Sequence, residues 1–298
     1  MENYTGEIAA LFTAICWSIT ATSFEYAGKK IGSLALNIIR LFMAFIFLGL
    51  FTWITRGLIL PVDASLDTWI WLGLSGVVGF VMGDLFLFEA FVRIGSRISM
   101  LIMASVPPIT AVLSFFILGE WMSVSQIIGM TITILGIAIV ILVKGDHKGN
   151  IKLSHPVKGI LFAFGGALGQ TLGLILSKFG MADYNAFAAT HIRVITGILG
   201  FAIVFTVKKR WGSVARAFRQ RKAMMVLTIG AIFGPFIGVS LSLVAIQHTN
   251  PGVASTIMAI TPVLIIPFSI AVHKEKITLK EALGALLTVV GVGYIFMV

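Results

Sequence analysis

Ten long apolar segments follow one another along this chain, and they limit its fold more than any other feature. Each is close in length to the roughly 20 residues that a helix needs to cross the hydrocarbon of a bilayer. None of them alternates polar and apolar residues as a barrel strand does. The sequence therefore predicts an all-α integral membrane protein with ten transmembrane helices. We expect them near residues 6–26, 34–55, 69–91, 97–118, 124–143, 158–178, 186–207, 223–246, 252–272 and 278–297.

The composition supports a lipid environment. Hydrophobic residues make up 58% of the chain and charged residues 11%, which is far more apolar than a soluble domain. The residues from Met1 to Thr5 contain no Lys or Arg, so we expect the first span to be retained rather than cleaved as a signal peptide. A single cysteine, Cys16, and the lack of Cys and His at metal-binding spacings predict no internal disulfide, no metal site and no cofactor.

The second half of the sequence repeats the first. Residues 79–136 align without a gap on residues 234–291, an offset of 155, with 12 identical positions. The matches include a proline, a glutamate and, at an offset of 153, an arginine: Pro107 with Pro262, Glu120 with Glu275, and Arg40 with Arg193. We divide the chain into a first five-helix repeat, residues 1–146, and a second, residues 147–298. Because five spans is an odd number, the two repeats are expected to be inverted relative to each other in the membrane.

Basic residues concentrate in alternate loops. The odd-numbered loops hold 18 of the 22 Lys and Arg residues, whereas the even-numbered loops and the tails hold only Arg56 and Lys178. The positive-inside rule then predicts cytoplasmic odd-numbered loops in a cell membrane, with both termini outside. The net charge of +10 would describe a face toward anionic lipid rather than a nucleic-acid site. Within the seventh loop, Trp211, Val214 and Phe218 have helical spacing among cations, which predicts a short helix on the lipid surface.

Inverted repeats favour a transport function. Two packings of similar energy, exchanged between the repeats, open a central site to one side of the membrane and then to the other. The sequence has no nucleotide-binding P-loop and no paired acidic motif for a metal diphosphate, so we do not expect an enzyme. Two alternatives stay open: a non-transporting membrane sensor or scaffold, and a membrane-embedded lipid-modifying enzyme, for which no convergent nucleophile and base are found.

One pattern marks the fourth and fifth spans of both halves. The first copy contains Pro107 and Glu120, and the second contains Pro262 and Glu275, each followed by spaced glycines. Together with Gly6-Glu7, Trp17 and Asn37-x-x-Arg40, this pattern resembles the EamA-like family of the drug/metabolite transporter superfamily. The resemblance implies a central cavity near mid-membrane, lined by helices from both halves, through which small metabolites or drugs pass. It also implies that the fifth and tenth helices lie at the periphery.

Ionisable residues inside the spans are the sharpest candidates for a site, because a charge within the membrane is costly. Arg40 lies about 10 Å deep on the side from which Asp84 and Glu89 are also reached, so we expect an intramembrane ion pair or coupling group among these three. Arg193 enters from the opposite side, where only Glu7 and Glu120 are expected nearby. An under-compensated guanidinium would suit a carboxylate or phosphate ligand. Its neighbour His191 could carry protons, although simple hydrogen bonding is an alternative for both side chains.

Other polar and soft side chains are candidates for lining a cavity. Trp17 and Ser18 align with Gln170 and Thr171 midway along their helices, and Asn37 lies one turn from Arg40. Met103 and Met258 match across the repeat and would give an adaptable wall, or simply fill the core. Small residues recur at every fourth position of the third, sixth and eighth spans, which predicts close helix packing. These residues are Ser75, Gly79, Gly83, Gly165, Gly169, Gly173, Gly230, Gly234 and Gly238.

We therefore expect a secondary transporter, and more specifically an exporter, of small organic metabolites such as amino acids or drug-like compounds. It would work by alternating access of the two repeats around the cavity. The expected partners are the small-molecule substrate and the lipid bilayer, with no nucleic acid. One chain contains both repeats, so a monomer is sufficient and a homodimer is compatible with the sequence.

Overall fold

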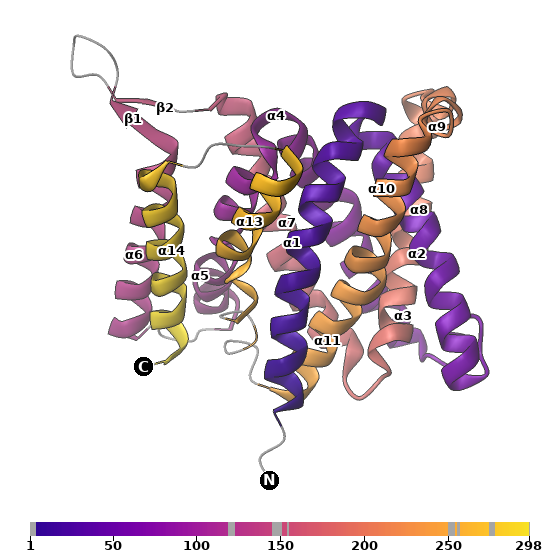
Figure 1. The fold of residues 1–298 in the computed structure, drawn as a ribbon. Helices are drawn as coiled ribbons and strands as arrows, with labels where there is room; N and C mark the ends of the chain where they lie inside the picture. The colour runs from indigo at the N-terminus through magenta and orange to yellow at the C-terminus, as the bar shows by residue number, and fades with distance from the viewer. Residues whose placement is uncertain are drawn as a thin grey trace.

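The computed structural model describes residues 4–118, 123–144, 151–153, 155–249, 254, 257–273 and 278–297. Nearly all of these residues are helical, and the helices stand side by side with both termini at one end of the molecule (Figure 1). The opposite end carries the surface helix α9 and the ribbon of β1 and β2 (Figure 1). The described parts of the basic fifth and seventh loops, β1 with β2 and α9, therefore share one end of the molecule.

The first half begins with two long helices and continues with a third that changes its pitch. In the middle of this third helix lies a π-helix, η1, between α3 and α4. Within α4 the chain turns at Gly95, whose φ of 81° is a left-handed conformation that glycine adopts without a steric penalty. The elements are α1 (Thr5–Ile31), α2 (Ser33–Arg56), α3 (Leu66–Gly76), η1 (Val77–Gly83), α4 (Asp84–Met103), α5 (Val106–Leu118) and α6 (Val124–Ile141).

The second half follows the same order. A second π-helix, η2, lies between α10 and α11, and its residues follow those of η1 by 155, the offset of the sequence repeat. The short helix α9 covers Trp211–Ala217, within the predicted surface helix. The other helices are α7 (Val157–Met181), α8 (Ala186–Val207), α10 (Arg221–Ala231), η2 (Ile232–Gly238), α11 (Val239–His248), α13 (Thr261–His273) and α14 (Leu279–Met297).

Six helical stretches among the described residues are long and apolar enough to cross a membrane. They coincide with the first, second, third, sixth, seventh and eighth predicted spans, and the third continues through the turn at Gly95. The other four predicted spans contain shorter helices, of 13 residues in α5 and α13, 18 in α6 and 19 in α14. The chain is thus a multi-pass helical membrane protein, and the described helices do not by themselves establish the count of ten.

One small element departs from the all-α expectation. The antiparallel ribbon of β1 (Leu142–Lys144) and β2 (Ile151–Leu153) joins the two halves. Three residues pair on each side, which satisfies backbone groups at the point where α6 has ended. The ribbon lies at the end of the bundle, so the helical architecture predicted for the membrane is unchanged (Figure 1).

The predicted stripes of small residues are helix–helix packing surfaces. A Cβ added to Gly169 of α7 would lie 2.5 Å from the Cα of Gly83, and one added to Gly173 would lie 2.9 Å from the Cα of Gly79. In the second half, a Cβ on Gly234 would lie 2.7 Å from the side chain of Thr20 in α1. The first helix of each half therefore packs closely against the third helix of the other half.

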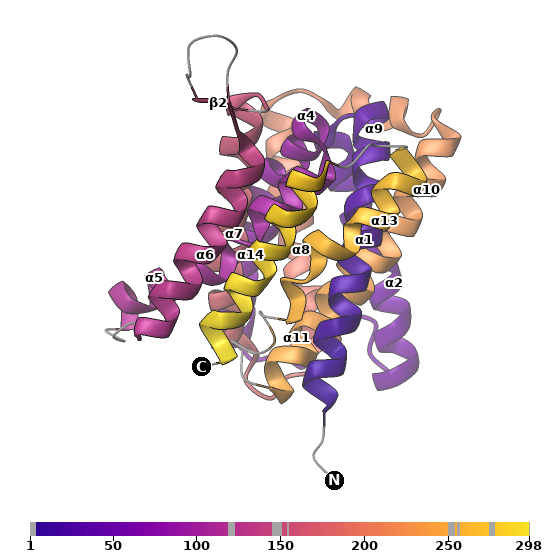
Figure 2. The ribbon, with the colours of Figure 1, turned by 60° about the vertical axis from the view of Figure 1, so that its left-hand side comes forward.

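The remaining helices complete the bundle. Helix α2 packs against α8, and α6 packs along α14 to one side of the other helices (Figures 1 and 2). Small residues again allow close contact, since a Cβ on Gly291 would lie 2.5 Å from the backbone nitrogen of Thr133. This arrangement agrees with the peripheral position that the resemblance implies for the fifth and tenth helices.

Candidate functional site

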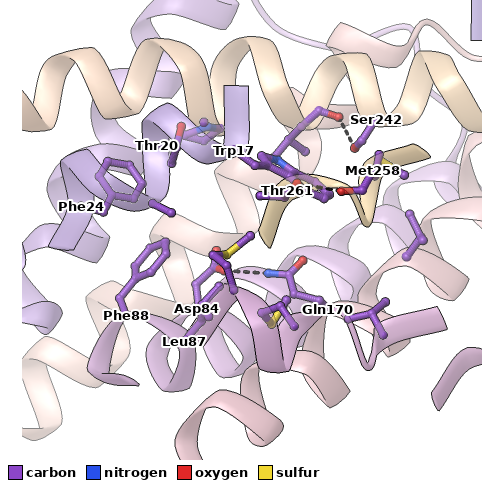
Figure 3. Close-up of a pocket in the computed structure, with 18 of the residues that line it drawn as sticks. Trp17, Thr20, Phe24, Asp84, Leu87, Phe88, Gln170, Ser242, Met258 and Thr261 are labelled. Atoms are coloured by element: carbon purple, nitrogen blue, oxygen red, sulfur yellow. Dashed lines mark hydrogen bonds between the residues drawn. The ribbon is translucent and has the colours of Figure 1, made fainter. Parts of the chain in front are cut away.

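A cavity of about 150 Å³ lies between the two halves, and both contribute to its wall. From the first half come Trp17 and Phe24 of α1 and Asp84 of α4, and from the second half come Gln170 of α7 and Ser242 of α11 (Figure 3). The starts of α5 and α13 also reach the cavity. Both of these helices begin with a proline in the first turn, where the missing N–H removes no helical hydrogen bond.

Arg40 and Asp84 form a buried ion pair at the wall of this cavity. Nη2 of Arg40 lies 2.5 Å from Oδ2 of Asp84, and both side chains are at most 5% exposed. Asn37 supports the pair, because its Oδ1 accepts from Nε of Arg40 at 3.2 Å while its amide donates to the Asp84 carbonyl at 3.3 Å. On the other side, Nε2 of Gln170 donates to Oδ1 of Asp84 at 2.6 Å (Figure 3).

Arg193 has no such partner. Its residue is 4% exposed, and within the described residues its guanidinium makes no hydrogen bond or ion pair, with Nε buried and unsatisfied. The guanidinium passes Gly79, where an added Cβ would lie 3.2 Å from Nη2. The guanidinium then reaches the cavity that Asp84 also lines. The carboxylate of Asp84 attracts it electrostatically, although the two groups form no ion pair. Two cations and one carboxylate thus line the described wall.

Phe80 lies between the two arginines. The guanidinium carbon of Arg193 is 4.8 Å from the centre of the Phe80 ring, and that of Arg40 is 5.4 Å from it. Arg40 also lies 4.6 Å from the ring of Phe88. Cation–π contacts of this kind partly replace the hydration that buried guanidinium groups lose.

Five of the nine predicted substrate-site residues line the cavity. The indole of Trp17, the amide of Gln170, the two repeat-related thioethers and the guanidinium of Arg193 all reach it, as do both motif prolines. These lining residues are Trp17, Gln170, Met103, Met258, Arg193, Pro107 and Pro262. Asn37 does not line the cavity itself, but it forms hydrogen bonds with Arg40 and Asp84, which do.

Three of the predicted residues lie in the surrounding core instead. The hydroxyl of Ser18 donates to Ala14 of its own helix at 2.9 Å, and that of Thr171 donates to the carbonyl of Val106 at 3.5 Å. His191 is fully buried against Phe45, with ring centres 4.9 Å apart and both ring nitrogens without a hydrogen-bond partner in the described structure. None of the three lines the cavity.

Two expectations about charge partners need correction. Glu89 does not join Arg40: its carboxylate accepts from Ser33 at 2.5 Å and pairs with Arg93 at 2.7 Å, one turn further along α4. Arg193 was expected near Glu7, but Glu7 accepts from Thr249 at 2.6 Å, and the carboxylate that Arg193 faces across the cavity is Asp84. The motif residues Glu120 and Glu275 lie outside the described residues.

Comparison with known families decides the identity of this architecture. A family model described as the EamA-like transporter family matches the chain twice, over residues 4–142 and 157–297. The chain belongs to the EamA-like transporter family. No curated protein matches it. Among solved structures 27 chains match, and one, described as "Crystal structure of protein", has a TM-score of 0.65. That match covers 98% of this chain and 96% of the other at 16% identity, which supports the fold alone.

In this EamA-like chain, sequence reasoning missed the aromatic wall of the cavity. Phe24, Phe80, Phe88 and Phe91 all line it, but in a sequence with 23 phenylalanines their spacing does not separate them from lipid-facing ones. The two arginines within the spans were a usable signal for this aromatic wall, because a buried guanidinium is stabilised by the faces of aromatic rings. Among the described residues no group of three or more His, Cys, Asp or Glu side chains could hold a metal ion.

A second polar cluster of the EamA-like fold lies where loops of the two halves meet the ends of α2 and α11. Asp63 pairs with Arg56, and the hydroxyl of Tyr184 donates to its other oxygen at 2.9 Å. Gln247 in turn donates to the Tyr184 carbonyl at 2.8 Å. Burial raises the pKa of Asp63, but the hydrogen bond from Tyr184, a backbone hydrogen bond and the Arg56 contact outweigh it. The pKa of Asp63 therefore lies below its ordinary value.

Proposed function

We propose that this chain is a secondary transporter, rather than an enzyme, of small organic metabolites that carry a carboxylate or a similar anion. Amino acids and drug-like acids belong to this class. The observation that carries the proposal is Arg193, a buried guanidinium that faces a cavity without an ion-pair partner in the described structure. An unpaired buried charge is costly, and an anionic substrate would supply the missing partner.

The arrangement of the helices supports alternating access. We propose ten membrane crossings in two inverted five-helix repeats, residues 1–146 and 147–298. Both termini lie at one end, and the first helix of each repeat packs on the third helix of the other (Figure 1). Smooth contacts between glycines let such helices rotate against each other without side chains having to pass. Because the cavity wall described here comes from one chain, a monomer would be sufficient.

For orientation we propose that the odd-numbered loops face the cytoplasm of a cell membrane. The support is the uneven distribution of basic residues, 18 against 2, between odd-numbered loops and the rest of the chain outside the spans. The ribbon of β1 and β2 in the fifth loop and α9 in the seventh loop lie at one end of the bundle, as this orientation requires (Figure 1). Export is the proposed direction of transport.

Metabolite profiling of the medium around overexpressing cells tests this function. Cells would produce wild type, Arg193→Gln or, as a matched control, Arg219→Gln, whose arginine is exposed in the seventh loop. We expect one or more carboxylate metabolites to accumulate outside with wild type and with Arg219→Gln, and to fall to the level of empty cells with Arg193→Gln. Membrane levels of the three proteins would be compared by immunoblot.

Each other outcome bears on a separate part of the proposal. Equal accumulation with Arg193→Gln would keep transport and remove this arginine from the substrate path. Depletion of a metabolite from the medium would reverse the direction. No change with wild type in either direction, across media that supply different organic acids, would argue against transport.

A further inference from the structure

We infer that the cavity selects organic anions that carry no ammonium group, with an apolar body about the size of a benzene ring, over zwitterionic amino acids. This inference rests on the proposed transport function and narrows its substrate class. It follows from three features of the described cavity wall: the balance of its charges, the hydrogen bonds already made by the carboxylate of Asp84, and the apolar nature of its remaining residues.

The balance of charges favours an anion. Among the described residues, the acidic and basic side chains that line the cavity are Arg40, Asp84 and Arg193, which leave one positive charge uncompensated. The cavity lies between packed helices, where water screens charges weakly and an unmatched charge acts strongly. A bound carboxylate would bring the total to zero, whereas a zwitterion would leave it at one positive charge.

The occupied carboxylate disfavours an ammonium group. Asp84 is the only acidic residue on the described wall, and both of its oxygens already accept, one from Arg40 and one from Gln170. The other acids near the membrane core also have partners: Glu25 pairs with Lys29, and Glu89 pairs with Arg93. An ammonium group would enter beside two guanidinium groups and find no free carboxylate in the described part of the chain.

The remaining wall suits an apolar body. Aromatic and aliphatic side chains make up most of this wall, including Trp17, Phe24, Leu87, Phe91, Met100 and Met103. The thioethers of the two methionines can adjust to ligands of different shapes. Cavities of about 150 Å³ with apolar walls bind benzene. Because Arg193 lines the same cavity, its guanidinium is available to the carboxylate that such a ring would carry.

Matched probes test this selectivity on the full chain in lipid nanodiscs. The three probes are 3-phenylpropionate, L-phenylalanine, which adds an ammonium group to the same skeleton, and 2-phenylethylamine, which lacks the carboxylate. Isothermal titration calorimetry would give their dissociation constants. We expect 3-phenylpropionate to bind roughly tenfold or more tightly than phenylalanine, the effect of about one charged hydrogen bond, and the amine not to bind.

A change on the opposite helix tests the charge balance without touching the arginines. Val239 lines the cavity and occupies the position that matches Asp84 in the repeat. Val239→Asp should add the missing carboxylate and weaken the binding of 3-phenylpropionate roughly tenfold or more. Val239→Asn, whose side chain has the shape of aspartate without the charge, should change the dissociation constant much less. Size-exclusion profiles of both variants would show that they are folded, and the wild-type probe series stands without them.

The outcomes separate this inference from the function on which it rests. Phenylalanine binding as tightly as 3-phenylpropionate, or Val239→Asp behaving as Val239→Asn does, would overturn the selectivity. Failure of all three probes to bind would overturn it as well. In each case Arg193-dependent accumulation of a metabolite outside cells would leave the proposed transport intact, whereas no change in any metabolite with wild type, in either direction, would argue against both.

Discussion

Removing only the carboxylate of Asp84 should destabilise the fold more than removing the whole Arg40–Asp84 pair. The two side chains are 2% and 5% exposed and lie 2.5 Å apart. Breaking a buried ion pair costs about 3–5 kcal/mol, whereas replacing both partners with apolar side chains is often nearly neutral. Asp84→Leu leaves two buried guanidinium groups without a carboxylate partner in the described structure, so we expect a loss of about 5 kcal/mol. Arg40→Met leaves Asp84 with Gln170 and Arg193, so we expect about 3 kcal/mol.

The double variant is the decisive measurement. If the singles were independent, Arg40→Met with Asp84→Leu would lose about 8 kcal/mol, but we expect it to lie within about 2 kcal/mol of wild type. The free energy of unfolding can be measured by titrating the protein with SDS in mixed micelles and following helicity by circular dichroism. A double variant as unstable as the sum of the singles would refute the reasoning, because the charges would then not be coupled.

Three further outcomes follow from the described contacts. Gly169→Ala should lower the free energy of unfolding by about 1–3 kcal/mol, because its Cβ would lie 2.5 Å from the Cα of Gly83. The control is Gly212→Ala, whose Cβ would have no atom within 4 Å, and an equal loss in this control would contradict the prediction. Asp63→Asn should lower the free energy of unfolding at neutral pH but not in acid, because the pKa of Asp63 is lowered in the folded protein. Such a carboxylate contributes stability above its unfolded pKa, near 3.9, and this contribution is lost as the pH falls through the folded pKa. A pH-independent difference would exclude that titration. A membrane-impermeant maleimide should label Ser213→Cys, in the seventh loop, in permeabilised cells but not in intact cells, because this loop is proposed to be cytoplasmic. Labelling of intact cells would reverse the proposed orientation.

Depth in the membrane could be read from the sequence, and it was enough to place Arg40 with Asp84. Counting residues from the loops puts both on one side of the bilayer, and the structure shows them in contact. The same counting put Arg193 on the opposite side, away from Asp84. About 10 Å of depth from each face of a layer about 30 Å thick leaves a gap that two long side chains close, and both guanidinium groups lie against Phe80.

Rotation about the helix axis could not be read from depth alone. His191 is two residues from Arg193, which turns it by about 200° around α8, so the two side chains cannot face one cavity. Ser18 and Thr171 are likewise turned by about 100° from Trp17 and Gln170. In a very apolar sequence both faces of a helix look alike, because lipid and the protein core accept the same residues, and periodicity carries little information about which face is inside.

The asymmetry between the repeats connects this packing with recognition. The framework is duplicated: two π-helices at an offset of 155, two stripes of glycine, two prolines at the starts of α5 and α13, and two buried arginines. The counter-ion is not, since Asp84 of the first repeat has Val239 as its counterpart. With an aspartate at both positions, each arginine could have its own partner and the cavity would carry no net charge. One divergent position therefore accompanies the change from an ion-paired arginine in one repeat to an arginine without an ion-pair partner among the described residues in the other, and that unmatched charge is the feature to which we propose an anionic solute binds.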